Sequence, residues 1–291
     1  MRGGLSVSAL ELDPKGTRVL VATEELGVLA SRDGAPFVES NAGLGASRVV
    51  AFDGVGDDGG RLLVAARAEE AGVHSLSWTR DGGRSWAPFA DRVAFSRLAW
   101  LRIVSSSDLR LVVGTGDGRV WTMVPGGPAE PVAAPPGGIA AVASSPGTGT
   151  VLAATDAGLF VGYVGPRRAV LFSATSATPV TESTGPFVWR RVASGPLVAV
   201  DIRGDRYVAI GPDRIVRGGL AALAAGLAAE VGSPAGLPPD VETVALGDGL
   251  RASVVYAATR TQVLVSTDGG GSWSPAPLPW PAREIKAIAA D

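Results

Sequence analysis

The sequence predicts an all-β chain that folds as a β-propeller, with six blades or, as the alternative, seven, and with residues 1–291 in a single domain. Two observations predict this fold. Apolar hairpins recur along the chain at a nearly constant spacing, and an aspartate- and glycine-rich turn follows some of them. Because 46% of the residues are hydrophobic, a chain of this length is able to bury a large core.

The recurring unit is an apolar strand, a short polar turn and a second apolar strand, which is the pattern of a β-hairpin. Copies begin at Leu20, Leu62, Leu111, Val151, Val208 and Val255. A further apolar strand precedes each hairpin and ends in a polar turn of its own. Each unit therefore contains at least three strands, as a propeller blade does.

The spacing of these preceding strands sets the expected number of blades. They begin at Leu5, Arg48, Leu98, Ile139, Leu197 and Val241. Successive starts are 41 to 58 residues apart, a period typical of propellers. A seventh strand, Glu284–Asp291, is expected to pair with the other terminus within one blade, or else to begin a seventh blade of a longer chain.

Two stretches interrupt the repeat. The segment Ala169–Pro186 is rich in Ser, Thr and Pro and predicts a long excursion in the fourth unit. The segment Gly219–Val231 predicts a short amphipathic helix packed on a blade edge, because leucines and a valine recur in it at helical spacing. Both are places where a partner contact or a simple edge cover is expected.

Composition excludes several classes of function. Lys and Arg total 26 against 28 Asp and Glu, so the chain lacks the basic excess of a nucleic-acid-binding protein. With no Cys and one His, we expect no metal and no cofactor. No apolar run reaches the roughly 18 residues of a membrane span. The N-terminus has no apolar signal segment, although a mature exported form would have lost one, so the compartment stays open.

A specific turn follows three of the hairpins, in two full copies and one shorter copy. Thr79–Trp86 and Ser266–Trp273 both read S/T-x-D-G-G-x-S-W, and Ser31–Phe37 is a copy one residue shorter. In such a turn the Asp accepts backbone N–H groups two or three residues on, and the Trp buries a large surface between blades. We expect a structural role for Ser31, Asp33, Thr79, Asp81, Gly83, Trp86, Ser266, Asp268, Gly270 and Trp273.

This turn resembles the Asp-box, or BNR repeat, of sialidase-like propellers, a group that includes sortilin-type propellers, xyloglucan-degrading enzymes and photosystem II assembly factors. The resemblance implies that the turns lie at the periphery, away from the binding face. Sialidases of the group carry an Arg-Ile-Pro motif and a Tyr–Glu pair. The chain has no Arg-Ile-Pro, and no Glu lies close in sequence to Tyr163, Tyr207 or Tyr256, so we assign no catalytic residue.

The candidate binding face consists of the turns between the second and third strands of the blades, which in propellers share a face with the connections between blades. Acidic residues in these turns are Glu24, Glu25, Glu69, Glu70, Asp117, Asp156 and Asp213. Of the charged residues there, we take as candidates Glu24, Glu69, Arg119, Asp156, Arg214 and Arg260. The alternative is that polar residues simply populate exposed turns.

Asp53, Asp57 and Asp58 lie in a glycine-rich stretch that offers carboxylates for calcium. The stretch lacks EF-hand spacing and aligns with ordinary polar turns, so we expect a solvated turn there.

Two functions follow from these observations. The favoured one is a non-catalytic Asp-box propeller that serves as a protein-interaction or assembly module, because the fold pattern is clear and the sialidase residues are missing. The alternative is a glycoside hydrolase or carbohydrate-binding propeller that uses two acids of the turns, about 5–10 Å apart. Aromatic residues make up only 6% of the chain, which argues against a sugar cleft with aromatic platforms.

Overall fold

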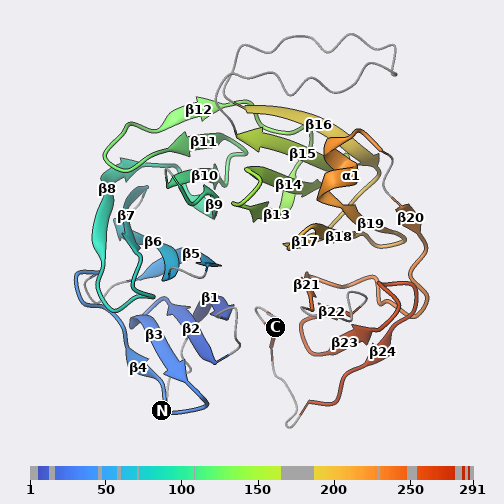
Figure 1. Ribbon diagram of the computed structural model, residues 1–291, viewed down its shortest axis with the longest axis horizontal. Helices are drawn as coiled ribbons and strands as arrows, with labels where there is room; N and C mark the ends of the chain where they lie inside the picture. The colour runs from blue at the N-terminus through green and yellow to red at the C-terminus, as the bar shows by residue number, and fades with distance from the viewer. Residues whose placement is uncertain are drawn as a thin grey trace. The chain divides into compact units, whose positions relative to one another are not determined.

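The computed structural model describes residues 6–12, 17–44, 48–57, 60–70, 72–107, 109–164, 187–227, 230–247, 254–278, 284–285 and 288. In this part of the chain the secondary structure consists almost entirely of β-strands, with one short helix (Figure 1). The side chains at positions 56–57, 60–62, 69–70, 164 and 230–231 lie outside the description.

The chain is a six-bladed β-propeller, as the sequence predicts: six sheets each contain four antiparallel strands in sequential order. The first strands of the blades are β1 (Val7–Leu12), β5 (Val49–Asp57), β9 (Leu98–Ser105), β13 (Ile139–Ser145), β17 (Ala199–Arg203) and β21 (Thr243–Leu246). Each begins within two residues of the start that the repeat predicts.

The remaining strands complete each sheet in turn. The second strands are β2 (Arg18–Thr23), β6 (Gly60–Glu70), β10 (Arg110–Thr115), β14 (Thr150–Thr155), β18 (Arg206–Ile210) and β22 (Val255–Ala258). The third strands are β3 (Gly27–Arg32), β7 (Val73–Thr79), β11 (Val120–Met123), β15 (Gly158–Val164), β19 (Ile215–Gly219) and β23 (Val263–Ser266). The outer strands are β4 (Val38–Glu39), β8 (Ala87–Ala94), β12 (Glu130–Val132), β16 (Phe187–Ser194), β20 (Glu230–Gly232) and β24 (Ser274–Pro275).

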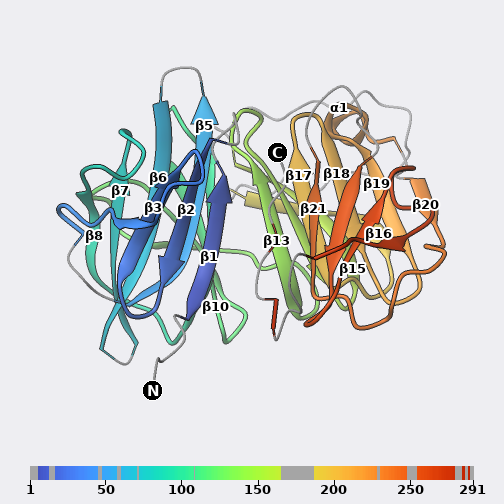
Figure 2. The ribbon, with the colours of Figure 1, turned by 90° about the horizontal axis from the view of Figure 1, so that it is seen from below.

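The burial of the strands explains their composition. Every residue of β14 is buried, because this strand lies in the middle of its sheet and both of its faces are covered. Such strands read as continuous apolar runs rather than as an alternation. The two residues of β4 are exposed, since this strand is the outer edge of its blade. Figure 2 shows β1, β2 and β3 of the first blade side by side, as their pairing requires.

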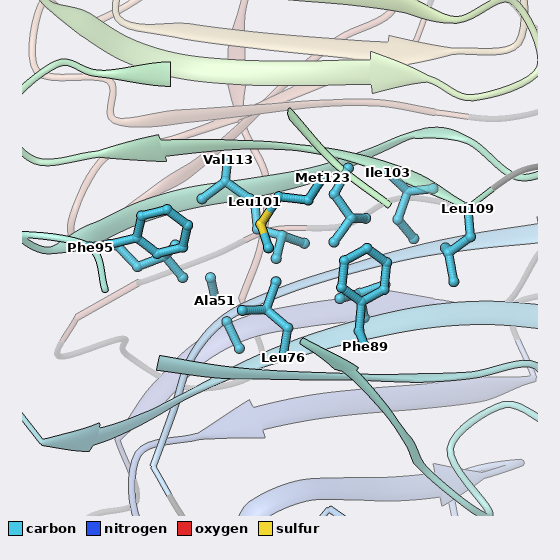
Figure 3. Packing of buried hydrophobic residues seen from close by; sticks show 13 residues of the cluster. Ala51, Leu76, Phe89, Phe95, Leu101, Ile103, Leu109, Val113 and Met123 are labelled. Carbon is cyan, nitrogen blue, oxygen red and sulfur yellow. The ribbon is translucent and has the colours of Figure 1, made fainter. Parts of the chain in front are cut away.

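The chain forms two compact units, 1–131 with 286–291 and 132–285. The first unit holds blades 1 to 3 and the second holds blades 4 to 6. Within the first unit, an apolar cluster fills the junction of blades 2 and 3, with Leu76 and Phe89 facing Leu101, Ile103 and Met123 (Figure 3). Within the second unit, separate apolar clusters fill the junctions of blades 4 and 5 and of blades 5 and 6.

The two predicted interruptions have different outcomes. The helix α1 (Leu220–Ala224) lies inside the stretch where a helix is expected, with Leu220 and Leu223 buried. It is shorter than predicted, because the N–H groups of Gly226 and Leu227 turn back to the carbonyls of Leu223 and Ala222 and close the helix. Leu227 is therefore 61% exposed. The predicted excursion Ala169–Pro186 lies outside the described residues.

Of the expected last strand Glu284–Asp291, only residues 284, 285 and 288 are described, and none of them belongs to a strand. The first blade is built entirely from β1 to β4, which are consecutive in the sequence. Within the described residues, no helix has the length and apolar character that a membrane span requires.

Candidate functional site

The candidate residues gather at one end of each blade, which we call the turn end. It holds the turn between the second and third strands, which among the described residues comprises 24–26, 72, 116–119, 156–157, 211–214 and 259–262. Because the four strands of a blade alternate in direction, the chain also leaves the outer strand and enters the next blade at this end. Each blade therefore has its turn and its connection at the same end.

In blade 1 the turn acids bind the start of the blade and the entry to the next one. Glu24 forms an ion pair with Arg48, which precedes β5, with 3.2 Å between Oε2 and Nη2. The carboxylate of Glu25 accepts the backbone N–H of Ser6 at 3.0 Å. Both contacts are exposed, so they hold the turn in place without a large contribution to stability.

In blade 2 the backbone of Glu69 and Glu70 ends β6, but their side chains lie outside the described residues. In blade 3 the Thr115 hydroxyl donates to Asp117 Oδ1 at 2.5 Å, and Arg119 Nε lies 3.4 Å from Asp117 Oδ2. The hydrogen bond from Thr115 holds the pKa of Asp117 below its ordinary value, against a smaller opposing effect of burial. This aspartate is therefore a charged acceptor within its own turn.

In blades 4 and 5 the turn acids are also engaged locally. Asp156 Oδ1 accepts the backbone N–H of Gly138, which precedes β13 of the same blade, at 3.0 Å. Asp213 pairs with Arg214 at 2.9 Å, and this hydrogen bond lowers the pKa of Asp213. Arg214 also donates to the carbonyl of Ser194 at the end of β16, so it joins the turn of blade 5 to the outer strand of blade 4.

In blade 6 the turn residue Arg260 faces two acids. Its Nη2 lies 2.9 Å from Glu284 Oε1 and its Nε lies 3.9 Å from Glu242 Oε1. The hydrogen bond from Arg260 to Glu284 raises the pKa of the guanidinium further above its ordinary value. The Arg260 side chain is 67% exposed, so most of it remains available to a binding partner.

These contacts decide what the turn ends can do chemically. A general acid in glycoside hydrolysis needs a raised pKa, whereas Asp117 and Asp213 both have lowered ones. Among the described residues, no group of three or more His, Cys, Asp or Glu side chains is arranged to hold a metal ion. What the described turn ends present is a set of exposed charged pairs of both signs.

The turn Thr79–Trp86 has a closed hydrogen-bond pattern at the opposite end of blade 2. Asp81 Oδ1 accepts the backbone N–H groups of Arg84 at 2.8 Å and Ser85 at 3.0 Å, three and four residues on, rather than two or three as predicted. The Ser85 hydroxyl donates to Asp81 Oδ2, and the Thr79 hydroxyl donates to Oδ1. Burial alone would raise the pKa of Asp81, but these hydrogen bonds outweigh it and lower the pKa well below its usual range.

The turn Ser266–Trp273 in blade 6 repeats this pattern. Asp268 accepts the hydroxyl of Ser272 at 2.6 Å and its backbone N–H at 2.9 Å, and the Ser266 hydroxyl donates at 2.7 Å. The hydrogen bonds from Ser272 hold the pKa of Asp268 well below its usual range. In the shorter copy, the Ser31 hydroxyl donates to the carbonyl of Ala35 instead. Phe37, at the place of the Trp, is 50% exposed.

Both full turns rest on the blade before them. The backbone N–H of Trp86 donates to the carbonyl of Ala42, and the indole N–H donates to the carbonyl of Ser40 at 2.7 Å. In the same way, the N–H of Trp273 donates to the carbonyl of Ala235. Ala42 and Ala235 each begin the tripeptide Ala-Gly-Leu that follows an outer strand. This repeated tripeptide is the sequence signal for the two contacts, and the motif alone did not predict them.

The expectation of a solvated turn at Asp53 is wrong. It lies inside β5 rather than in a solvated turn, and it is only 9% exposed. Its Oδ2 accepts the backbone N–H of Ile103 at 2.6 Å, and Arg102 Nη1 lies 3.9 Å from its Oδ1. Asp201 on β17 likewise accepts the N–H of Leu246 at 2.8 Å. These carboxylates join first strands of neighbouring blades, and the signal for them was the shared pattern Val-Ala-Phe-Asp and Val-Ala-Val-Asp.

No family model matches this chain, and no curated protein matches it by sequence. Solved structures do match it. The structure of U3-55K has a TM-score of 0.61 at 13% identity and covers 99% of this chain and 86% of its own. The RRP9 WD40 repeats have a TM-score of 0.61 at 14% identity, with coverage of 99% and 85%.

A third match is the GH74 xyloglucanase from Xanthomonas campestris, with a TM-score of 0.60 at 19% identity. It covers 94% of this chain, which spans 45% of the xyloglucanase chain. At these identities the likeness is one of fold alone. The comparisons therefore show that the chain has the architecture of a β-propeller.

Proposed function

We propose that the chain is a non-catalytic propeller that binds a protein partner at the turn ends of its blades. The observation that carries this proposal is that the acidic side chains of the turns are already engaged in local contacts. Glu24, Asp156 and Asp213 each bind an arginine or a backbone N–H close to their own turn. Acids that already bind an arginine or a backbone N–H suit a recognition surface of mixed charge better than proton transfer.

The arginines of the turn ends support the same proposal. Arg119 and Arg260 have side chains that are 73% and 67% exposed. Arginine is enriched at protein interfaces, because its planar guanidinium makes several directed hydrogen bonds to carboxylates and carbonyls. Two of the matched structures, U3-55K and the RRP9 WD40 repeats, have the same fold and give this proposal its architectural precedent.

The turns Thr79–Trp86 and Ser266–Trp273 are, in this proposal, Asp-boxes with a structural role. Three features support it: the aspartate accepts hydrogen bonds from its own turn, the tryptophan is buried, and the turn contacts the preceding blade. The turn end of blade 2 lies at the other end of β7 from its box, so the box serves packing and leaves the proposed binding surface free.

The alternative is a carbohydrate-binding or glycoside-hydrolysing propeller, which the fold likeness to the GH74 xyloglucanase favours. Such an enzyme needs two carboxyl groups that face one substrate, one of them protonated. Of the described turn acids, Asp117 and Asp213 are unsuited to be the protonated group, since both have lowered pKa values. We therefore place this function second.

One experiment with two readouts tests both functions. The purified chain is incubated with fluorogenic glycosides and oligosaccharides, and turnover and thermal shift are measured. In parallel, immobilised chain captures partners from a lysate of its source cells, with quantitative mass spectrometry. Capture is repeated with Arg119→Glu and Arg260→Glu, and with Arg32→Glu as the control, since Arg32 is exposed at the opposite end of blade 1.

The expected result is a protein captured by the wild type and by Arg32→Glu, with capture reduced at least about tenfold in a turn-end variant, since charge reversal places like charges across the interface. Equal capture by all four proteins would contradict binding at the turn ends. Product release from a glycoside, lost in Glu24→Ala or Asp156→Ala, would contradict a non-catalytic role and establish the alternative.

A further inference from the structure

His74, the only histidine of the sequence, is buried at the junction of blades 2 and 3. It lies on β7 and is 5% exposed. The centroid of its ring is 6.1 Å from that of Phe95, a member of the apolar cluster between the two blades (Figure 3). A titratable ring is thus packed against the core that joins two blades.

Two buried nitrogen atoms at this position, His74 Nδ1 and Trp121 Nε1, lack hydrogen-bond partners. His74 Nδ1 is buried and has no hydrogen-bond partner. The ring of Phe95 also lies 6.1 Å, between centroids, from that of Trp121 on β11, whose buried indole N–H has no partner either. A buried polar atom without a partner costs free energy, and a charge placed on the same ring costs more.

The nearest strand partners of His74 are apolar. Across the sheet it pairs with Ala68 on β6 and with Val93 on β8. Val93 packs on the same apolar cluster as Leu76, which lies two residues after His74 and therefore on the same face of β7. Nothing in this row offers an acceptor to a protonated imidazole.

Charged side chains on the packed elements have other neighbours. On β8, Asp91 accepts the hydroxyl of Ser75, which lies on the opposite face of β7. After β8, the side chain of Arg97 lies against Gly116. Others are Arg67 on β6, which donates to the Leu44 carbonyl, and Arg92 on β8, which is exposed. In blade 3, Arg102 on β9 lies 3.9 Å from Asp53, and Asp117 pairs with Arg119 before β11. The side chains of Glu69 and Glu70 on β6 lie outside the described residues.

We propose that His74 is a pH-sensitive switch in the junction of blades 2 and 3. The neutral imidazole completes the apolar packing between Val93 and Phe95. The imidazolium requires water or a carboxylate, and it reaches water only when the junction opens. Acidification therefore loosens blade 3 from blade 2, while the junctions of blades 4 and 5 and of blades 5 and 6 in the second unit keep their packing.

The direction of the pH dependence follows from the burial of the ring. Burial lowers the pKa of His74 below its ordinary value of 6.5. In the folded chain the ring is therefore harder to protonate than in the unfolded chain. The stability that neutral His74 contributes is fully present above about pH 6.5 and is lost as the pH falls below that value toward the folded pKa.

Because of the composition, the titration of His74 can be followed with little overlap from other groups. The chain has one His and no Cys. Unperturbed carboxyl groups titrate near pH 4 and the α-amino group at about 7.7–8.0. Histidine is thus the side chain whose unperturbed pKa lies between pH 5 and pH 7, and His74 is the one histidine of the sequence.

The first measurement is a proton NMR titration of the wild type, in which the carbon-bound ring protons of one histidine are observed. The expected result is a midpoint below 6.5 and line broadening or loss of dispersion for residues of β7, β9 and β11 as the midpoint is approached. A midpoint at or above 6.5 would overturn the proposal without any variant.

The second measurement compares hydrogen exchange of the wild type and of His74→Phe at pH 7 and pH 5. In the wild type we expect the opening equilibrium of β7 and β9 to increase on acidification, by at most about tenfold per pH unit, because one proton is taken up. The variant should lack this increase, and β18 and β22 of the second unit serve as the internal control. The same increase in the variant, or an equal one in β18 and β22, would overturn the proposal.

Discussion

The carboxylate of Asp53 on β5 accepts the backbone N–H of Ile103 on β9, with 2.6 Å between Oδ2 and N. This hydrogen bond joins the first strand of blade 2 to the first strand of blade 3. Asp201 does the same for Leu246 one blade further in the second unit, at 2.8 Å. First strands have a free edge within their own sheet, so a carboxylate from the neighbouring blade satisfies a donor that the sheet leaves unpaired.

Replacement of Asp53 by Ala should therefore weaken the junction of blades 2 and 3. Asp53 is 9% exposed, and its loss leaves the N–H of Ile103 without its acceptor. We expect the free energy of unfolding to fall by about 1–3 kcal/mol, measured by urea denaturation. Asp240→Ala, at an exposed position, is the control and should change it by less than about 0.5 kcal/mol. Equal losses in the two variants would contradict a special role for Asp53.

The two aromatic residues that follow the Asp-Gly turns of blades 1 and 2 should differ sharply in their contribution to stability. Trp86 is 6% exposed, contacts Phe52 and donates its indole N–H to Ser40, whereas Phe37 is 50% exposed. Trp86→Ala should lower the free energy of unfolding by about 3–5 kcal/mol, because it leaves a cavity and an unpaired carbonyl. Phe37→Ala should lower it by less than about 1 kcal/mol.

The measurement is urea denaturation monitored by circular dichroism, since Trp86→Ala also changes the fluorescence. Trp86→Phe helps to separate the two causes, because it removes the indole N–H but leaves a much smaller cavity than Ala does. A loss in Phe37→Ala as large as in Trp86→Ala would show that the exposed copy packs in solution.

Acid should destabilise the chain through Asp81 and Asp268. Hydrogen bonds lower the pKa of both carboxyl groups well below the value of 3.8 that applies to an unperturbed Asp. Their contribution to stability is therefore present above about pH 4 and is lost as the pH falls below it, because the unfolded chain takes up protons first. We expect the thermal midpoint of the wild type to fall between pH 4 and pH 2.

The double variant Asp81→Asn/Asp268→Asn should start from a lower thermal midpoint at pH 6 and lose less of it on acidification. Asn has one oxygen acceptor and no charge, so it keeps part of the turn and removes the proton uptake. Parallel curves for the variant and the wild type would mean that other carboxyl groups carry the acid response.

The blades themselves were predictable, because hydrophobic alternation and turn residues are local signals. The starts of β9 and β13 coincide with the predicted ones, at Leu98 and Ile139. Asp53 was misplaced for a physical reason: the glycines around it suggested a turn, but β5 runs to Asp57 in a long hairpin with β6. A strand that continues through glycine is held by its partner strand, which local sequence does not reveal.

The candidate site was only partly predictable. The position of Glu24 at a turn follows from the hairpin pattern, but its ion pair with Arg48 depends on how blade 2 packs on blade 1. The shortened copy Ser31–Phe37 shows the same limit. It lacks the serine that in the full turns donates to the aspartate, and Ala35 and Pro36 supply no hydroxyl in its place. The motif alone therefore does not predict that the Phe37 side chain is exposed.

Gly43 and Gly34 allow a matched test of how the turn of blade 2 rests on blade 1. Both have positive φ, +84° and +75°, so Ala should cost about 1–2 kcal/mol at either position from backbone strain alone. At Gly34 an added Cβ meets nothing, whereas at Gly43 it would overlap the carbonyl oxygen of Trp86. Gly43→Ala should therefore lower the urea midpoint further than Gly34→Ala and expose Trp86 to a fluorescence quencher. Equal midpoints in the two variants would mean that the contact between Gly43 and Trp86 does not hold the blades together.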